Sequence, residues 1–414
     1  MIYKVPYGTN LIQFELANNQ FVDFYTPKSA RKIDNPIHFI KKCIHFDEII
    51  RSNSHVAIAI NDHTRPVPNN LMLPPLLLEL HRYGIEKKNI IFLISTGTHK
   101  KLTKKEIASI LPQNIINEYR IVCHNCDSNS LVYLGKTKIG TPISVNPYFA
   151  EADIKIVTGN IEPHHFMGYS GGVKSAAIGL TSRETITKNH SLIFHPKSFI
   201  GEFEENPMRQ DIEEIGEIIG VDYALNTVLN WNKEIVDVFW GKPSDVIRKG
   251  VICAQQICQV PIKKKYDLVI SSAGGFPKDI NLYQAQKAIT HASLIAKRGA
   301  VIILIAACAG GIGNSLFFDQ FKGKNSMREV INSVKKIEFS IGPHKAYQLA
   351  SQGLDYSINL VSELEKHVVR TFLLHPYTTA QLAIDDALKA IPRNPHIAVL
   401  PYATNTIAIT NNQP

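Results

Sequence analysis

His55-Val56-Ala57-Ile58-Ala59-Ile60 is a short, apolar, β-rich run, and a polar loop that contains Asp62 and Arg65 follows it. Three more runs of this kind occur, each followed by a polar loop and then a segment with helical periodicity: Asn89–Ser95, Tyr119–His124 and Asp153–Thr158. Strands that alternate with helices in this way form βαβ units on a parallel sheet. The sequence therefore predicts an α/β fold with mostly parallel sheets.

A second series of strands begins after residue 265. Pro261–Tyr266 contains three consecutive lysines and indicates a solvated connector. The strands predicted beyond it are Asp267–Ser272, Ala300–Ala307, Lys336–Ile341, Thr371–Leu374 and His396–Leu400. Because 414 residues are many for one hydrophobic core, we expect two α/β domains, residues 1–265 and 266–414, with the active site in the cleft between them. Residues 1–26 alternate apolar and polar side chains around turn residues, which predicts a small hairpin or meander.

The composition excludes several classes of protein. Hydrophobic residues make up 44% and charged residues 20%, as in folded globular proteins. The net charge of +9 fits either a solvated surface or a site for small anions such as phosphates and carboxylates. The basic residues are scattered and lack interleaved aromatics, so we expect no nucleic-acid binding. With no signal-peptide pattern, no apolar run of membrane-spanning length and only six cysteines, we expect a cytoplasmic protein without a membrane partner.

The segment Glu162–Lys174 concentrates side chains that carry chemistry, and we place the active site there. The pair His164-His165 offers imidazoles for proton transfer or metal binding. Lys174, beside a Gly-Gly turn, can reach an anion or form a covalent bond. A phosphate loop requires glycine directly before the lysine, and Val173 stands there instead. Ser170-Gly171-Gly172 can still form a backbone anion nest.

Two loops at other strand ends carry further candidates. In Asp62-His63-Thr64-Arg65-Pro66-Val67-Pro68 the two prolines stiffen the loop, and the planar guanidinium suits a phosphate or carboxylate. A rigid surface turn with an exposed ion pair is the alternative. His99 ends the loop after the second strand and gains a functional interpretation only if that loop meets the others. Ligands of parallel sheets gather at the carboxyl ends of the strands, where all these residues fall.

Weaker signals remain open or are discounted. His190, on the helix-like stretch Ser182–His190, and His195 are equivalent by spacing. Tyr283, Gln284 and Lys287 lie one helical turn apart, either to address one ligand together or as a solvated face. Cys123 and Cys126 have zinc-like spacing, and Gly311–Leu316 follows a strand. A second close cysteine pair and a third glycine are missing, so neither zinc nor a dinucleotide is expected.

In combination, these motifs resemble the lactate racemase family in order and spacing over roughly residues 55 to 290. They are Asp62–Pro66, Gly97–His99, Glu162–His164, Gly168–Lys174, His190, and Asn281–Gln284 with Lys287. That family uses nickel in a nickel-pincer nucleotide, pyridinium-3,5-bisthiocarboxylic acid mononucleotide, whose two sulfurs and one carbon hold the metal. The resemblance implies a racemase or epimerase of 2-hydroxy acids, which is an isomerase, served by proteins that make and insert the cofactor.

The resemblance also implies a role for each residue. His99 and His164 are the two acid–base groups. Lys174 carries the cofactor through a thioamide bond, and His190, rather than His195, is the protein ligand to nickel. The residues implied to line the cofactor are Asp62, His63, Thr64, Arg65, Ser170, Gly171 and Gly172. The residues implied to hold the substrate are Arg65, Tyr283, Gln284 and Lys287.

The implied chemistry is reversible hydride transfer. Removing a proton from the carbon of a 2-hydroxy acid creates a costly dianion, whereas removing a hydride leaves a neutral ketone. Two histidines are needed because the two enantiomers present their hydroxyls on different sides, and imidazole serves both directions. Two alternatives stay open: another metal-dependent enzyme on this scaffold, such as a hydrolase or lyase, and a non-catalytic nucleotide-binding module.

Overall fold

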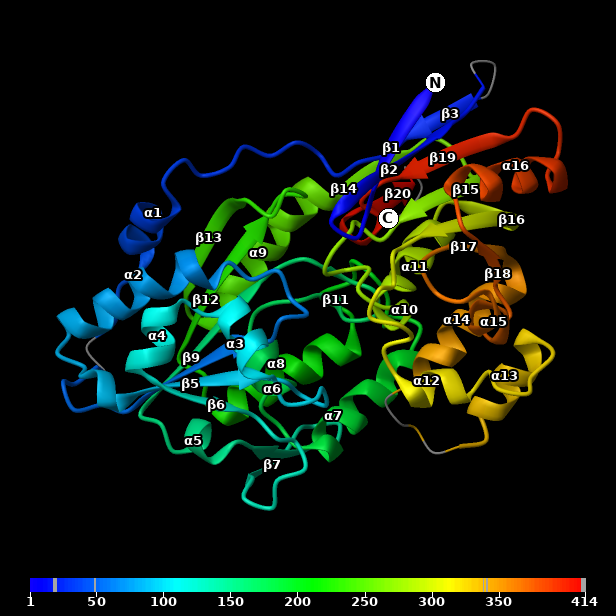
Figure 1. The fold of residues 1–414 in the computed structure, drawn as a ribbon. Helices are drawn as coiled ribbons and strands as arrows, with labels where there is room; N and C mark the ends of the chain where they lie inside the picture. Colours follow the sequence, from blue (N-terminus) through cyan, green and yellow to red (C-terminus); the bar gives the residue numbers. More distant parts are fainter. Residues whose placement is uncertain (18–20, 48–49, 338, 340–341, 411–414) are drawn as a thin grey trace. The chain divides into compact units, whose positions relative to one another are not determined.

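The chain folds into two compact units, which we call the central unit and the terminal unit (Figure 1). The structure is a computed structural model and describes residues 1–17, 21–47, 50–337, 339 and 342–410. The central unit comprises residues 29–256, and the terminal unit comprises residues 1–28 and 257–414. The division differs from the expected boundary, because residues 1–28 and 257–265 pack with the C-terminal half. Among the described residues, no helix is both long enough and apolar enough to span a membrane.

A six-stranded sheet, in the order β13-β12-β9-β4-β5-β6, forms the middle of the central unit. Its strands are β4 (Val56–Asn61), β5 (Ile90–Ser95), β6 (Arg120–Cys123), β9 (Ile154–Asn160), β12 (Tyr223–Leu229) and β13 (Ile235–Gly241). All neighbours are parallel except β12 and β13. The four strands predicted here are confirmed as β4, β5, β6 and β9, with small shifts at their ends.

Helices cover this sheet. They are α1 (Pro36–Cys43), α2 (Asn69–Arg82), α3 (Lys104–Ile110), α4 (Gln113–Glu118), α5 (Pro147–Ala150), α6 (Lys174–Ala177), α7 (Arg183–His190), α8 (Pro207–Ile219) and α9 (Pro243–Cys258). Two small antiparallel pairs accompany them, β7 (Val132–Lys136) with β8 (Pro142–Val145) and β10 (Pro163–His164) with β11 (Gly168–Tyr169). Short 3-10 helices occur at Lys87–Asn89 and Ser191–Phe194.

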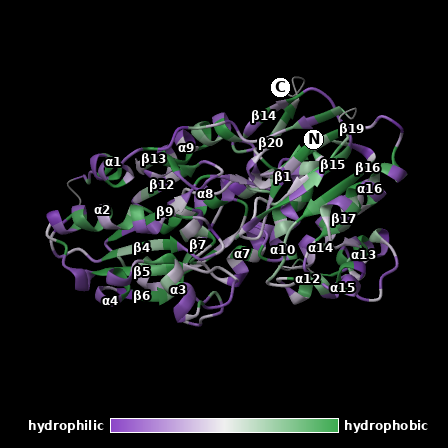
Figure 2. Ribbon diagram, turned by 45° about the horizontal axis from the view of Figure 1, so that its top comes forward, coloured by the Kyte–Doolittle hydropathy of each residue, from purple (hydrophilic) through white to green (hydrophobic). Residues whose placement is uncertain are grey.

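Strand β4 is buried on both faces, which explains its unbroken apolar sequence. Ala57 and Ala59 belong to the core on one face of the sheet, and Ile58 and Ile60 belong to the core on the other. Strands β4 and β5 are accordingly coloured as hydrophobic in Figure 2. The alternation of small and large side chains lets α6 approach β4 on the alanine face, since α6 contributes Ala176 to that core.

The order of the strands creates a switch point in the central sheet. From β4 the chain proceeds to β5 and β6 on one side, and then returns to place β9 on the other side of β4. The loops that leave β4 and β9 therefore diverge from neighbouring carboxyl ends. In open α/β sheets ligands bind in the crevice at such a point. This topology directs attention to the loops that follow Asn61 and Asn160.

The terminal unit has a second six-stranded sheet, in the order β18-β17-β16-β15-β19-β3, with all neighbours parallel. Its strands are β3 (Phe21–Phe24), β15 (Tyr266–Ser272), β16 (Ala296–Ile305), β17 (Ser357–Val361), β18 (His375–Tyr377) and β19 (His396–Leu400). Two smaller pairs are β1 (Ile2–Tyr7) with β2 (Asn10–Glu15), and β14 (Gln259–Ile262) with β20 (Ile407–Thr410). The hairpin predicted in residues 1–26 is confirmed as β1–β2.

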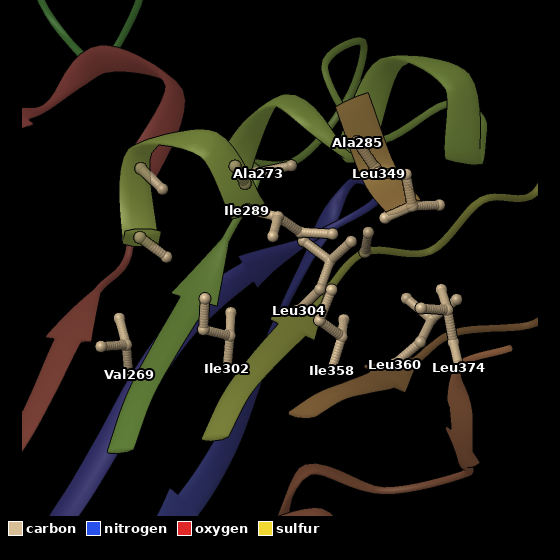
Figure 3. Packing of buried hydrophobic residues seen from close by; sticks show 14 of the residues in the cluster. Val269, Ala273, Ala285, Ile289, Ile302, Leu304, Leu349, Ile358, Leu360 and Leu374 are labelled. Atoms are coloured by element: carbon tan, nitrogen blue, oxygen red, sulfur yellow. The ribbon is translucent and has the colours of Figure 1, made fainter. Parts of the chain in front are cut away.

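The helices of the terminal unit are α10 (Leu282–Ala285), α11 (Lys287–Ser293), α12 (Ser315–Asp319), α13 (Met327–Val334), α14 (Pro343–Asp355), α15 (Lys366–Thr371) and α16 (Ala380–Ala390), with a 3-10 turn at Ala403–Asn405. Strand side chains such as Ile302, Leu304 and Ile358 meet Ile289 of α11 and Leu349 of α14 in one packed cluster (Figure 3). This core orients α10 and α11, which carry the predicted substrate residues.

Three of the strands predicted after residue 260 are confirmed, and other predictions for this part of the chain are not. The strands at Asp267–Ser272, Ala300–Ala307 and His396–Leu400 are confirmed as β15, β16 and β19. The strand predicted at Thr371–Leu374 is wrong, because Thr371 ends α15 and Leu373 turns the chain with φ +58°. Half of the strand predicted at Lys336–Ile341 (residues 338, 340 and 341) lies outside the described residues, and Lys336, Ile337 and Phe339 are not in a strand. The solvated connector predicted at Pro261–Tyr266 is confirmed only in its middle: Lys263 and Lys265 are exposed in the loop between β14 and β15, whereas the ends of the stretch belong to these strands.

Candidate active site

The loops after β4 and β5 meet through a carboxylate and an imidazole. Asp62 is buried, with 4% of its side chain exposed, and its Oδ2 lies 2.6 Å from Nδ1 of His99. The other carboxylate oxygen, Oδ1, accepts hydrogen bonds from the Thr64 amide at 3.1 Å and the Thr64 hydroxyl at 2.6 Å. His99 itself is 47% exposed. One edge of the ring is therefore held by Asp62, while about half of the side chain is exposed.

The Asp62 carboxyl is ionised at neutral pH. Burial by itself raises its pKa, but the hydrogen bond and charge of His99, the Thr64 hydroxyl and the charge of Arg65 outweigh burial and lower the pKa to about 2. An ionised carboxylate only accepts hydrogen bonds, so Nδ1 of His99 is the donor. The lone pair of the neutral ring then lies on Nε2. This is the arrangement by which a buried carboxylate prepares a histidine for proton transfer.

Arg65 connects the β4 loop to the β9 loop. Its Nη1 lies 3.8 Å from Oε1 of Glu162, and both side chains are mostly buried. Its backbone amide donates to the Asp62 carbonyl at 3.2 Å, which keeps the loop tight. The preceding His63 places Nε2 3.8 Å from Oε1 of Glu106. The predicted meeting of these loops is thus observed in the contacts of Asp62 with His99 and of Arg65 with Glu162.

The segment after β9 folds back as the short β10–β11 hairpin, in which His164 pairs with Gly168. His164 is buried, and its Nδ1 accepts a hydrogen bond from the Met167 amide at 3.3 Å. Its ring lies 4.6 Å from the His165 ring, centroid to centroid. Gly168 has φ +69°, and a Cβ there would lie 1.7 Å from the Glu202 carbonyl oxygen. Only glycine fits this position, so the hairpin that presents His164 depends on it.

The turn at Gly171 and Gly172 is closely packed rather than flexible. Both residues have positive φ, and a Cβ at Gly171 would lie 2.7 Å from Oδ1 of Asn226. That same oxygen accepts the Gly172 amide at 2.7 Å, and the Ser170 amide donates to the Glu162 carbonyl at 2.8 Å. Two of the three amides of the predicted anion nest therefore bond within the protein.

The interpretation of Ser170-Gly171-Gly172 as a backbone anion nest is corrected accordingly. The polar atoms that remain available to a ligand here belong to side chains. The Ser170 hydroxyl is buried and has no hydrogen-bond partner among the described residues, and the same holds for Oδ1 of Asn160 and Oγ1 of Thr227. Asn160 is the last residue of β9, and Thr227 of β12 is its register partner. Buried polar atoms without partners are rare in folded proteins. They indicate polar space for a ligand beside the turn that precedes Lys174.

Lys174 begins α6 and is half-buried. The next residue, Ser175, donates from Oγ to the Thr158 carbonyl of β9 at 3.2 Å, which anchors the helix on the sheet. The turn before Lys174 is held by Arg209, whose buried guanidinium donates to the Gly171 and Tyr169 carbonyl oxygens. Arg209 and Asn226 were missed in the sequence, since each lies in an ordinary amphipathic helix or apolar strand.

The two histidines that spacing left equivalent have different surroundings. His190 ends α7, is half-buried, and lies with its ring centroid 5.7 Å from that of Phe166 in the hairpin. His195 is exposed, and its Nδ1 accepts the Lys197 amide at 3.2 Å. Of the pair, His190 is therefore the one in ring contact with the segment that carries His164.

Two of the three predicted substrate residues of the terminal unit are in contact with each other. Lys287 donates from Nζ to Oε1 of Gln284 at 2.6 Å, although the two lie in separate short helices. The Asn281 side chain caps α10 by accepting the Gln284 amide. Burial raises the pKa of Tyr283, and the buried Lys345 places Nζ 5.8 Å from its ring centroid. Lys345 of α14 joins this group and was missed, because nothing in its local sequence marks it.

The structure shows the surroundings of the two discounted motifs. Cys123 and Cys126 are free thiols, and no three His, Cys, Asp or Glu side chains gather as a metal site within the described part of the chain. Gly313 has φ +85° and packs against Asn281, with a Cβ there falling 2.5 Å from its side chain. The glycine loop after β16 thus supports α10.

Comparison with known proteins finds similar sequences over most of the chain. The family model for the lactate racemase N-terminal domain matches residues 7–201, and the model for the lactate racemase C-terminal domain matches residues 262–408. A lactate racemase of Thermoanaerobacterium thermosaccharolyticum is 30% identical over 347 residues, which is 80% of each chain. A lactate racemase of Lactiplantibacillus plantarum is 32% identical over 305 residues, 73% of this chain and 70% of that protein.

Solved structures agree. The lactate racemase apoprotein of Thermoanaerobacterium thermosaccharolyticum superposes with a TM-score of 0.90 at 27% identity, covering 99% of this chain and all of that one. A Thermotoga maritima protein of known crystal structure shares the fold, with a TM-score of 0.71 at 15% identity over 94% of this chain. The matches span both units and most of the length of the relatives. The chain therefore belongs to the lactate racemase family and is an enzyme of the isomerase class.

Proposed function

We propose that this enzyme racemises or epimerises a 2-hydroxy acid of the lactate type by reversible hydride transfer, with His99 and His164 as the acid–base pair. The observation that carries the proposal is the hydrogen bond from Nδ1 of the half-exposed His99 to the buried Asp62 carboxylate, which leaves Nε2 of His99 available to take a hydroxyl proton. Once the hydroxyl proton leaves, departure of a hydride from the carbon that bears the hydroxyl group yields a neutral ketone. A planar keto acid can then be reduced on either face.

The residues of the central unit fit a nickel-pincer nucleotide. Lys174 offers a primary amine at the start of α6, and His190 offers one imidazole beside Phe166. The buried, unpartnered oxygens of Ser170, Asn160 and Thr227 supply polar groups for such a ligand. When bound, this cofactor supplies a pyridinium carbon that accepts and returns a hydride. Thr64 and Arg65 would contribute to its binding from the β4 loop.

Substrate binding is assigned to Arg65 with Tyr283, Gln284 and Lys287. A guanidinium and an ammonium are suited to hold the carboxylate, and positioning of this kind can lower a barrier by several kcal/mol. The contact between Lys287 and Gln284 supports a shared role. A cytoplasmic location and the proteins that make and insert the cofactor also belong to this proposal.

The proposal is tested with the full chain produced together with the cofactor-making proteins. Chiral analysis of a panel of single-enantiomer 2-hydroxy acids should show conversion toward the racemate for at least one acid. His99→Ala and His164→Ala should abolish conversion while nickel stays bound, whereas His190→Ala should lose nickel. Nickel loss in both His99→Ala and His164→Ala would contradict their assignment.

Intact-mass measurement separates the alternatives. We expect a covalent adduct that disappears in Lys174→Ala, with one nickel per chain. Metal without an adduct, together with no racemisation, would favour a hydrolase or lyase. Retained nucleotide with neither metal nor turnover would favour a non-catalytic binding module.

A further inference from the structure

The two proposed acid–base histidines are held by hydrogen-bonding groups of opposite character. Nδ1 of His99 faces a carboxylate oxygen of Asp62 at 2.6 Å, and Thr64 donates two hydrogen bonds to the other oxygen of that carboxylate. A carboxylate that takes donors on both oxygens acts as an acceptor throughout. The His99 ring therefore carries its proton on Nδ1, and Nε2 holds the lone pair.

His164 faces a donor instead. The Met167 amide lies 3.3 Å from Nδ1 of His164, and a backbone N–H can only donate. Nδ1 must then hold the lone pair, which places the proton of the neutral ring on Nε2. The hairpin enforces this geometry, since His164 pairs with Gly168 and the Tyr169 amide bonds to the Met167 carbonyl at 2.7 Å. The His165 and Phe166 rings, at 4.6 and 4.5 Å from the buried His164 ring, confine it further.

We propose that the fold presets the two imidazoles as opposite tautomers, so that Nε2 is a proton acceptor in His99 and a proton donor in His164. Asp62 and the Met167 amide act as positioning groups for this pair. The catalytic meaning rests on the proposed function, whereas the tautomers themselves are a property of the chain alone.

In the resting protein the two tautomers therefore suit only one enantiomer of the substrate. When the substrate hydroxyl faces His99, its O–H bond breaks and the proton joins Nε2, which gives an imidazolium still bonded to Asp62. His164 meanwhile donates a hydrogen bond from Nε2–H, as a neutral imidazole does when it polarises an oxygen. The opposite enantiomer meets this N–H where it needs a base. For that half of the reaction His164 must release the Met167 amide and exchange its tautomer.

Nuclear magnetic resonance of the full chain labelled with 15N-histidine tests this directly. Two-bond 1H–15N correlation spectra at neutral pH distinguish ring nitrogens that carry a proton from those that do not. His99→Gln and His164→Gln variants assign the signals, since each removes one ring. We expect a protonated Nδ1 and unprotonated Nε2 for His99, and the reverse for His164. An unprotonated Nε2 on His164, or two protonated nitrogens, would overturn the inference.

Positioning variants separate this role from a structural one. Asp62→Asn should exchange the two nitrogen patterns of His99 and leave those of His164 unchanged. Met167→Leu, which keeps the amide, should alter neither ring. Met167→Pro, which lacks the amide, should abolish the fixed pattern of His164 only, with the His99 signals reporting an intact fold. No change at His164 would remove Met167 from the proposal, and if this variant does not fold, the wild-type spectrum still decides.

These spectra need neither cofactor nor substrate, so the two proposals fail separately. Opposite tautomers in a chain without racemase activity would sink the proposed function alone. Active racemase with identical tautomers would sink only the present inference.

Discussion

The buried guanidinium of Arg209 donates hydrogen bonds to the Gly171 carbonyl oxygen from both terminal nitrogens, at 3.1 and 3.2 Å. It also forms an ion pair with Glu213, one helical turn along α8. The turn that presents Lys174 is therefore held by a charged side chain inside the protein. Removal of such a charge affects stability and the site together.

Arg209→Met should lower the free energy of unfolding by roughly 3 kcal/mol, because a mostly buried Glu213 and two carbonyl oxygens lose their partner. Urea unfolding measures this. Arg183→Met is the matched control, since Arg183 binds Asp127 with both side chains about half exposed, and such a pair is worth about 1 kcal/mol or less. If both variants lose the same unfolding free energy, burial of Arg209 does not strengthen its contribution to stability.

Gly171→Ala should destabilise the protein more than Gly220→Ala. Both glycines have positive φ, which costs an alanine about 1–2 kcal/mol. A Cβ at Gly220 meets nothing within 4 Å, whereas one at Gly171 would lie 2.5 Å from Cγ1 of Ile161 and 2.7 Å from Oδ1 of Asn226. The difference between their unfolding free energies reports the close packing of the turn, and a difference near zero would contradict it.

Asp62→Asn should lower kcat by about two to four orders of magnitude, because an amide can donate to Nδ1 of His99 and reverse its tautomer. Steady-state racemisation with loaded enzyme gives kcat, and intact mass gives the cofactor load. Asp127→Asn, at an exposed ion pair, should leave both unchanged. If Asp62→Asn instead loses the adduct while retaining turnover per loaded chain, Asp62 belongs with the cofactor contacts alone.

The contribution of Asp62 to the stability of the protein should also decrease in acid. Its folded pKa of about 2 lies below the ordinary value of 3.8, so its ionisation favours the folded state above pH 3.8. This stabilisation, about 2 kcal/mol in full, is lost as the pH falls toward 2. The stability difference between wild type and Asp62→Asn should therefore shrink by about 1 kcal/mol from about pH 5 to about pH 3. A constant or growing difference in urea unfolding would contradict the lowered pKa.

Local sequence was enough to predict the fold class and seven of the twelve strands in the two six-stranded sheets. Strands β4, β5, β9 and β15 can be recognised in the sequence as apolar runs, because strands buried on both faces tolerate few polar residues. The motifs at their ends were found for a similar reason, since loops of parallel sheets carry the polar groups. Strand β17 was missed, and Thr371–Leu374 was wrongly predicted as a strand, because short runs do not reveal whether neighbours will pair or turn.

What the sequence by itself determined is which residues are candidates for chemistry: its motifs, together with the family resemblance that they carry, single out His99, His164, Lys174 and His190. The tertiary structure decided their partners. Asp62, which was predicted to contact the cofactor, bonds to His99 across 37 positions, and Arg209 supports a turn 38 positions away. The N-terminal strand β3 joins the sheet of the opposite end of the chain. Periodicity and spacing report neighbours along the chain, whereas tautomers, buried charges and lowered pKa values arise from contacts that only folding creates.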